Sequence, residues 1–162
     1  MQTNYSRFFA DATVDVLSTF MDAPAEVGPP TEVEGVSEVQ EVTVLLGLTG
    51  SLEGCFFLEF SKPSALKICE FMNFGEPFEE LDDFACATLC ELANLAGGRA
   101  VTLLNDNGGT LSIAPPTIFC GKEMRIGGTK NKFLIPVSTE AGCININVSI
   151  KNSHSVPERK IA

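Results

Sequence analysis

The most regular pattern of the chain lies in residues 81–106, where apolar residues recur at helical spacing. One side of the helical wheel collects Leu81, Ala85, Thr88, Leu89, Leu92, Leu95, Ala96 and Leu103. Glu91 and Asn94 fall on roughly the opposite side, about 60° apart and about 4.5 Å apart along the axis. Their nearest neighbours there are Ala87 and Gly98. The pattern predicts a helix that presents an acid and an amide side by side on a nearly bare surface.

Two consecutive glycines at the edge of that face admit different explanations. Gly97 and Gly98 lie inside the periodic pattern, and each weakens a helix by about 1 kcal/mol relative to Ala. They could end the helix early, or let a neighbouring helix pack closely. Alternatively, a partner molecule lies against this face, so that Glu91 and Asn94 reach into the partner.

The spacing of the acid and the amide does not decide between these explanations, because the chain contains a second E-x-x-N. That second motif, Glu70 to Asn73, ends the preceding predicted helix and is followed closely by Gly75. Asn73 is therefore expected to act as a helix stop rather than as a working side chain. Only the small residues around the first motif distinguish it from the second.

The remaining periodicity predicts an α+β domain with an antiparallel sheet covered by helices on one face. Helices are predicted over residues 5–21 and from an N-cap at Ser61 to about Asn73; strands are predicted over residues 41–49, 54–60, 111–120, 132–137 and 142–150. An acidic, proline-rich connection over residues 22–40 could contain a short strand near Thr31. We expect one domain over residues 1–152 and a polar tail over residues 153–162.

Two details of the predicted strands constrain the sheet. Pro115 and Pro116 interrupt the strand over residues 111–120, and prolines cannot donate to a ladder of hydrogen bonds, so this strand is expected at an edge or at a bulge. In the last strand Ile144, Ile146, Val148 and Ile150 alternate with Asn145, Asn147 and Ser149. The alternation predicts one apolar and one polar face.

Composition and charge narrow the partners that the protein can take. The chain has 162 residues, 44% of them hydrophobic, and a formal net charge of −10. No cluster of Lys or Arg precedes the tail, so we expect neither nucleic acid nor an anionic membrane surface as a partner. No signal-peptide pattern opens the chain, and no apolar run is long enough to span a bilayer, which favours a cytoplasmic protein.

The residue types that usually build an active site are sparse. The six cysteines form no C-x-x-C and are expected to be reduced core or edge residues, and His154 in the tail is the only histidine, so no metal site is predicted. Phosphate-binding glycine loops and a G-x-S-x-G are absent as well. If the chain catalyses a reaction, it is expected to lend side chains to a site that another molecule largely builds.

Three segments resemble the CheX branch of the CheC-type chemotaxis phosphatases. They are ELANLAGGRA at residues 91–100, LSIAPPTIFCG at residues 111–121, and GLTGSLEGCFFLEFSKPSALKI at residues 47–68. The resemblance covers residues 42–150, and its most specific parts are Glu91-x-x-Asn94 with Gly97 and Gly98, Pro115-Pro116-Thr117, and Gly121. Because the motif occurs once in that context, the resemblance fits a homodimeric CheX-like chain better than CheC, which carries two copies.

This resemblance implies a protein aspartyl-phosphate phosphatase that acts on a phosphorylated CheY-type receiver. It implies that Asn94 orients the attacking water and that Glu91 contacts the receiver's Lys, with Ala87 and Gly98 at the contact with the partner. The receiver would hold the Mg²⁺, so the chain needs no cofactor of its own. Glu91 as a general base is a weaker alternative, because hydrolysis of an acyl phosphate does not demand one.

A second hypothesis is a non-catalytic, CheC-like binding or adaptor module of a signalling or flagellar-switch complex. Such a module would use the same helix face to bind its partner but would leave the lifetime of the phospho-aspartate unchanged. Exposure of Glu91 and Asn94 is required by the phosphatase hypothesis, since a face filled by the protein's own core could not enter a receiver.

Overall fold

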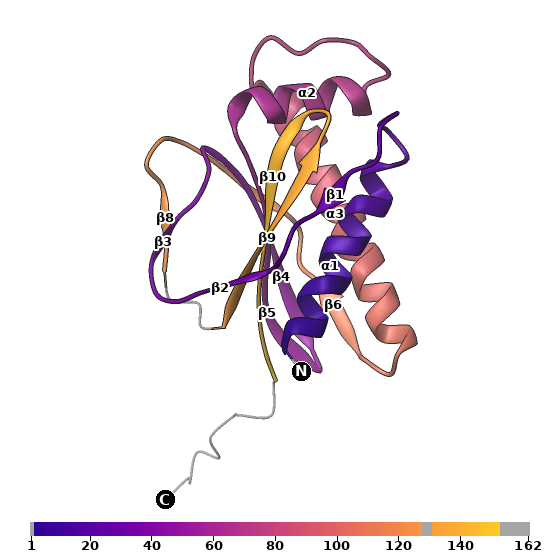
Figure 1. The fold of residues 1–162 in the computed structure, drawn as a ribbon, viewed down its shortest axis with the longest axis vertical. Coiled ribbons are helices and arrows are strands. Elements are labelled where there is room, and N and C mark those ends of the chain that lie inside the picture. Colours follow the sequence, from indigo (N-terminus) through magenta and orange to yellow (C-terminus); the bar gives the residue numbers. More distant parts are fainter. Residues whose placement is uncertain (1, 128–130, 153–162) are drawn as a thin grey trace, which may run out of the picture.

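The protein forms a main antiparallel sheet with helices on one face, seen in a computed structural model that describes residues 2–127 and 131–152 (Figure 1). The described helices are α1 (Gln2–Leu17), α2 (Lys62–Met72) and α3 (Asp83–Asp106). The described strands are β1 (Glu26–Val27), β2 (Thr31–Val33), β3 (Ser37–Glu38), β4 (Val42–Gly50), β5 (Leu52–Phe60), β6 (Leu111–Ile113), β7 (Thr117–Cys120), β8 (Arg125–Ile126), β9 (Lys132–Thr139) and β10 (Gly142–Asn152). The predicted tail, with His154, lies outside the described residues.

Two long hairpins form the centre of the sheet. The order of strands is β1-β9-β10-β5-β4-β6, with β2 also paired to β9 and β7 also paired to β4, and all of these pairs are antiparallel. Strands β3 and β8 pair with each other in a separate small sheet. The predicted α+β class, with helices on one face of an antiparallel sheet, is therefore confirmed (Figure 1).

The proline-interrupted strand lies at an edge, as predicted. Strands β6 and β7 both pair with β4, one after the other, and Pro115 and Pro116 occupy the gap between them. The N–H of Ala114 still donates to the carbonyl of Gly47 at 2.9 Å, so the ladder is broken only at the prolines. This edge brings Ile113 and Ile118 against the core beneath α3.

Two predictions for the N-terminal part were wrong. The first helix ends at Leu17 rather than at residue 21, because the chain tightens into hydrogen bonds three residues apart, from Thr19 to Val16 and from Phe20 to Leu17. The connection over residues 22–40 contains three short strands, β1 to β3, of which only one, near Thr31, was expected.

The core lies between the helices and one face of the sheet. From β5, Phe56, Leu58 and Phe60 point into it, and the ring of Phe56 lies 4.9 Å from that of Phe9 on α1. The alternation predicted for β10 is confirmed on this side, since its four apolar residues all belong to the core.

The opposite face of the central strands holds a buried polar cluster of Glu59, Asn147 and Lys132, each at most 2% exposed. The side-chain amide of Asn147 donates to the Glu59 carboxylate, and the Lys132 ammonium donates to the hydroxyl of Ser37 on β3. The N–H of Gln40 approaches the same carboxylate at 3.4 Å. Residues 37–40 are thereby fastened across this face, which explains why it is buried although no helix covers it.

Candidate functional site

The helix that carries the predicted site is α3, and its start is fixed by a capping side chain. The carboxylate of Asp82 accepts a hydrogen bond from the N–H of Ala85 at 2.8 Å, so the helix begins at Asp83. From there the helix packs its buried side, including Leu89 and Leu92, against the sheet. Since this anchored side fixes the rotation of the helix, it also fixes which residues face outward.

Glu91 and Asn94 are both exposed, as the helical spacing predicted. Within the described residues, no side-chain hydrogen bond or ion pair engages either of them. Ala87 is exposed and Gly98 is half-buried, so no large side chain stands between the acid and the amide on this face. The structure therefore brings all four predicted site residues onto one accessible surface, which we call the α3 ridge.

The two glycines of the motif have different surroundings. Gly97 is buried, and a Cβ atom there would lie 2.8 Å from Cδ1 of Leu46 on β4, closer than carbon atoms pack. A Cβ atom at Gly98 would lie 4.0 Å from Cδ1 of Ile113, an ordinary contact. Neither glycine ends the helix. Gly97 permits close packing against a strand rather than against the neighbouring helix, whereas no contact in the described chain requires a glycine at position 98.

A hollow runs along one flank of the α3 ridge, and the sequence pattern did not predict it. It measures about 420 Å³ and is lined by Phe20, Met72, Asn73, Phe84, Ala87, Thr88, Glu91 and Leu95. Leu95, placed by the wheel with the apolar side, is 39% exposed, because neither α1 nor α2 extends over it.

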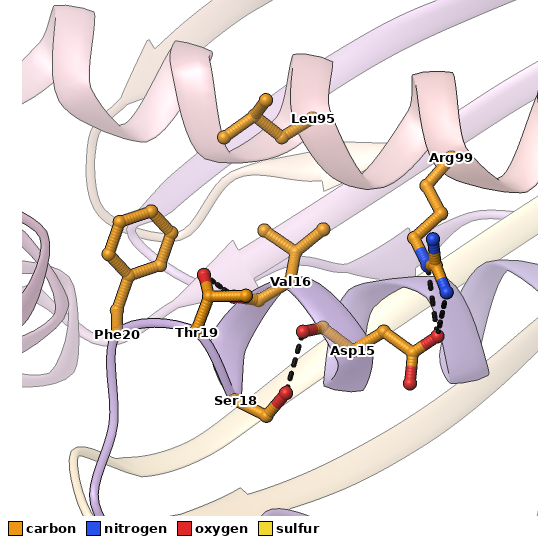
Figure 2. A pocket seen from close by; sticks show the side chains of 7 residues that line it. All are labelled: Asp15, Val16, Ser18, Thr19, Phe20, Leu95 and Arg99. Carbon is orange, nitrogen blue, oxygen red and sulfur yellow. Dashed lines mark hydrogen bonds and ion pairs between the residues drawn. The ribbon is translucent and has the colours of Figure 1, made fainter.

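A second hollow, of about 560 Å³, shares Phe20 and Leu95 with the first and continues it towards the C-terminal part of α3. Figure 2 shows this end, where Arg99 reaches from α3 to Asp15 on α1 with nitrogen–oxygen distances of 2.8 and 2.9 Å. We call the two adjoining hollows the α3 groove. Because Glu91 is part of its lining, whatever binds the ridge also meets the groove.

The other flank of the ridge carries thiols. Cys90 lies one turn and Cys86 two turns before Asn94, and the thiol of Cys120 on β7 interacts with Cys86. Burial is the main cause that raises the pKa of Cys86 and Cys90, with smaller contributions from neighbouring thiols and, for Cys86, Asp83. A thiol with a raised pKa is a weak nucleophile. The chemistry of the site therefore rests on the amide and the acid.

In the chain as far as it is described, no three His, Cys, Asp or Glu side chains are arranged to hold a metal ion. None of the described helices is both long and apolar enough to cross a membrane. The ridge is an outward face rather than an enclosed pocket for a small substrate. An amide and an acid displayed in this way can orient a water molecule and pair with a cation that another macromolecule brings.

Sequence reasoning found the ridge but missed the apolar lining of the groove. Phe84 is 58% exposed. The helical wheel assigned it to neither face of the helix, and a large apolar residue outside the apolar side is the sequence signal that could have identified it. Phe20 and Met72 enter the lining from the ends of α1 and α2, so their role depends on where those helices stop.

Comparisons with known proteins agree with this geometry. The family model described as chemotaxis phosphatase CheX matches residues 42–138, more than half of the chain. The curated CheY-P phosphatase CheX of Thermotoga maritima is 28% identical over 113 residues, which cover 70% of this chain and 73% of that protein.

Solved structures show the same fold. A crystal structure of the chemotaxis protein CheX from Desulfovibrio desulfuricans matches with a TM-score of 0.82 at 24% identity, covering 91% of this chain and 99% of that one. The CheX–CheY–BeF₃–Mg²⁺ complex from Borrelia burgdorferi contains a chain that matches with a TM-score of 0.77 at 29% identity, covering 91% of this chain and 98% of that one.

Proposed function

This chain belongs to the CheX family of chemotaxis phosphatases, and we propose that it acts by lending two side chains of α3 to an active site on its substrate. The substrate is a phosphorylated receiver of the CheY type, and the reaction is hydrolysis of its aspartyl phosphate. The observation that carries the proposed roles is the exposure of Glu91 and Asn94 on a face free of large side chains.

The division of labour between the two proteins follows from what each can supply. The receiver holds the acyl phosphate, a Lys and a Mg²⁺ ion, which together neutralise charge on the phosphoryl group. In the reaction the oxygen of water attacks phosphorus, the bond from phosphorus to the aspartate oxygen breaks, and the aspartate leaves as a carboxylate. Both protons of the water stay with the inorganic phosphate, which is released as H₂PO₄⁻. What this chain adds is the placement of the water.

Asn94 is the residue that we assign to the water. Its carboxamide oxygen accepts a hydrogen bond from the water, which leaves a lone pair of the water directed at phosphorus and in line with the leaving aspartate. Because the side chain is exposed and has no partner in the described chain, it is available for this contact without breaking an internal bond.

Glu91 is the residue that we assign to the register of the complex. A charge-assisted hydrogen bond from the receiver's Lys to this carboxylate would fix how far along the ridge the receiver sits. The exposed Ala87 and half-buried Gly98 let the receiver's backbone approach closely beside the two working side chains.

We also propose that the protein acts as a homodimer in the cytoplasm, which its membership of the CheX family supports. Light scattering on the purified protein would measure the first point directly, and a mass near twice 17.3 kDa is expected.

The proposed roles are tested by following the decay of a phosphorylated CheY-type receiver with and without the protein. We expect the wild-type protein to accelerate the decay, and Asn94→Ala to lose about 100-fold or more of that acceleration while still binding the receiver loaded with BeF₃⁻. Glu91→Ala is expected to weaken binding as well as hydrolysis.

Glu70→Ala is the matched control, because it removes the acid of the second E-x-x-N on α2. It is expected to leave the decay unchanged. Full activity in both Asn94→Ala and Glu91→Ala would refute the assignment. Complex formation with no change in the receiver's decay would instead identify an adaptor module.

A further inference from the structure

The flank of α3 beside Glu91 displays a continuous row of side chains. Phe84, Thr88, Glu91, Leu95 and Arg99 follow one another at spacings of three or four residues, and all of them line the α3 groove. From Phe84 to Leu95 the row is about 16 Å long, since a helix rises 1.5 Å per residue. The groove is therefore long enough to receive about three turns of a helix, or a loop, from another protein.

The groove exposes apolar surface that the described part of the chain leaves partly uncovered. Phe84 is 58% and Leu95 is 39% exposed, and Phe20 and Met72 are only half-buried at the opposite wall. A contiguous apolar surface of this kind is typical of a contact with another protein. Because Glu91 lies within the same lining, the contact is continuous with the α3 ridge.

Phe74 strengthens this interpretation. It follows Asn73, a residue of the groove lining, in the sequence. It follows the C-cap of α2 with a φ of 54°, and the N–H of Gly75 closes the turn by donating to the carbonyl of Glu70 at 2.9 Å. This left-handed position is usually occupied by glycine, and bulky residues are disfavoured there. The side chain is also 98% exposed, so no packing within the described chain compensates for the unfavourable backbone.

The end of the groove nearest to Phe84 is acidic. A third hollow shares Asn73 and Phe84 with the groove and is lined by Glu76, Glu79, Glu80 and Asp82. No Lys or Arg occurs between Lys67 and Arg99 in the sequence. These carboxylates are therefore complementary to basic side chains of a partner.

We propose that the α3 groove, together with Phe74, is the surface that selects the receiver. It takes an apolar side chain that the receiver presents beside its phosphorylated aspartate, while a neighbouring Lys or Arg of the receiver faces the acidic end. This proposal rests on the proposed function, because Glu91 joins the groove to the hydrolytic ridge. It assigns choice of partner to the groove and placement of water to Asn94.

The decisive variants are Phe74→Gly and Leu95→Ala, measured for binding to the BeF₃⁻-loaded receiver by fluorescence anisotropy and for kcat and KM of dephosphorylation. We expect binding to weaken and KM to rise by about 10-fold in each, with kcat within about 2-fold of wild type. Phe74→Gly should also unfold at the same or a higher temperature than wild type, because glycine suits the positive φ.

Phe119→Ala is the matched control. Phe119 is 47% exposed, but it alternates with Ile118, which packs on the core, and so it faces the helix-free side of the sheet. Its removal is expected to leave binding and KM unchanged. Equal binding by all three variants and the wild type would overturn the proposal, as would an equal loss in Phe119→Ala.

Two further outcomes are informative. If Phe74→Gly or Leu95→Ala converts a homodimer to a monomer, the groove is covered by a second copy and the proposal is wrong. If wild-type protein fails to speed the receiver's decay but binding still depends on Phe74 and Leu95, the proposed hydrolysis fails while the groove keeps its role. Replacing Glu79 and Glu80 by Gln should slow association and reduce its dependence on salt.

Discussion

At the scale of single residues, the two adjacent glycines of α3 separate a requirement of the fold from a requirement of function. Gly97 is buried against Leu46 and leaves no room for a methyl group. Gly98 has room for one, and as a glycine inside a helix it lowers helical stability. The fold does not need a glycine at position 98, beside Glu91 and Asn94. We therefore expect that a partner protein needs the small residue there.

Paired substitutions test this difference. Gly98→Ala is expected to stabilise the protein by up to about 1 kcal/mol, through helix propensity, and to slow dephosphorylation because the added methyl group stands between the ridge and the receiver. Gly97→Ala is expected to destabilise it by about 1 kcal/mol net, since the crowding against Leu46 outweighs the same gain in propensity.

Urea unfolding measures the stabilities, and the decay of the phosphorylated receiver measures activity. If the Gly98→Ala variant is more stable than the wild type and fully active, the receiver does not approach this part of the ridge.

At the scale of elements, the site depends on α3. The residue that caps this helix is distant from the two residues that we assign to the reaction. Asp82 caps the first turn, whereas Glu91 and Asn94 lie two to three turns further on and opposite the side anchored by Leu89 and Leu92. Fraying at the first turn should therefore not disturb the ridge.

We expect Asp82→Ala to lower the free energy of unfolding by about 1 kcal/mol while kcat stays at the wild-type value. Thermal unfolding and steady-state dephosphorylation of the same sample measure the two quantities. A proportional fall in kcat would mean that the orientation of the ridge depends on the cap rather than on the packing of its buried side.

The elements also show what the sequence could predict and why the rest could not be predicted. The long strands β4, β5, β9 and β10 and the helices α2 and α3 begin or end within about two residues of their predicted limits, because their own periodicity and caps specify them. Strands β1, β3 and β8 are two residues long and depend on partners far away in the sequence, as Glu26 does on Ser138. No local pattern identifies such strands.

Some features of the candidate site could likewise be predicted from the sequence, and others could not. The exposure of Glu91 and Asn94 follows from the helical wheel, since it depends only on which side of α3 is apolar. The placement of Leu95 with the buried side was wrong, because whether an apolar residue is covered depends on where α1 and α2 end. The α3 groove is built from α3 and from the C-terminal ends of α1 and α2, so it could not be derived from any one helix.

At the scale of the whole molecule, the sheet separates two faces with different roles. The helices, α3 among them, cover one face of the sheet (Figure 1). The buried cluster of Glu59, Lys132 and Asn147 lies on the other face. Burial raises the pKa of Glu59 to about 7, although the N–H of Gln40 and the charge of Lys132 act in the opposite direction. The carboxyl group therefore changes charge near neutral pH without contacting the ridge.

The direction of the resulting pH dependence follows from which state holds the proton. Between its ordinary pKa of 4.5 and about 7, Glu59 is ionised in the unfolded chain but protonated in the fold, so stability falls as pH rises. The difference between the two pKa values corresponds to about 3 kcal/mol, lost across this range and fully lost above it. Below pH 4.5 both states are protonated, so this contribution is fully present and no longer changes with pH.

Glu59→Gln should remove this dependence, because a glutamine carries no charge at any pH and can still bond to Asn147. We expect the variant to match the wild type near pH 5 and to be more stable by about 3 kcal/mol at pH 8, with kcat unchanged because the ridge lies across the sheet. Glu53→Gln, on the same strand but 47% exposed, should follow the wild type throughout. Urea unfolding from pH 5 to pH 8 distinguishes these cases, since parallel curves for wild type and Glu59→Gln would show that folding does not raise the pKa of the Glu59 carboxyl group.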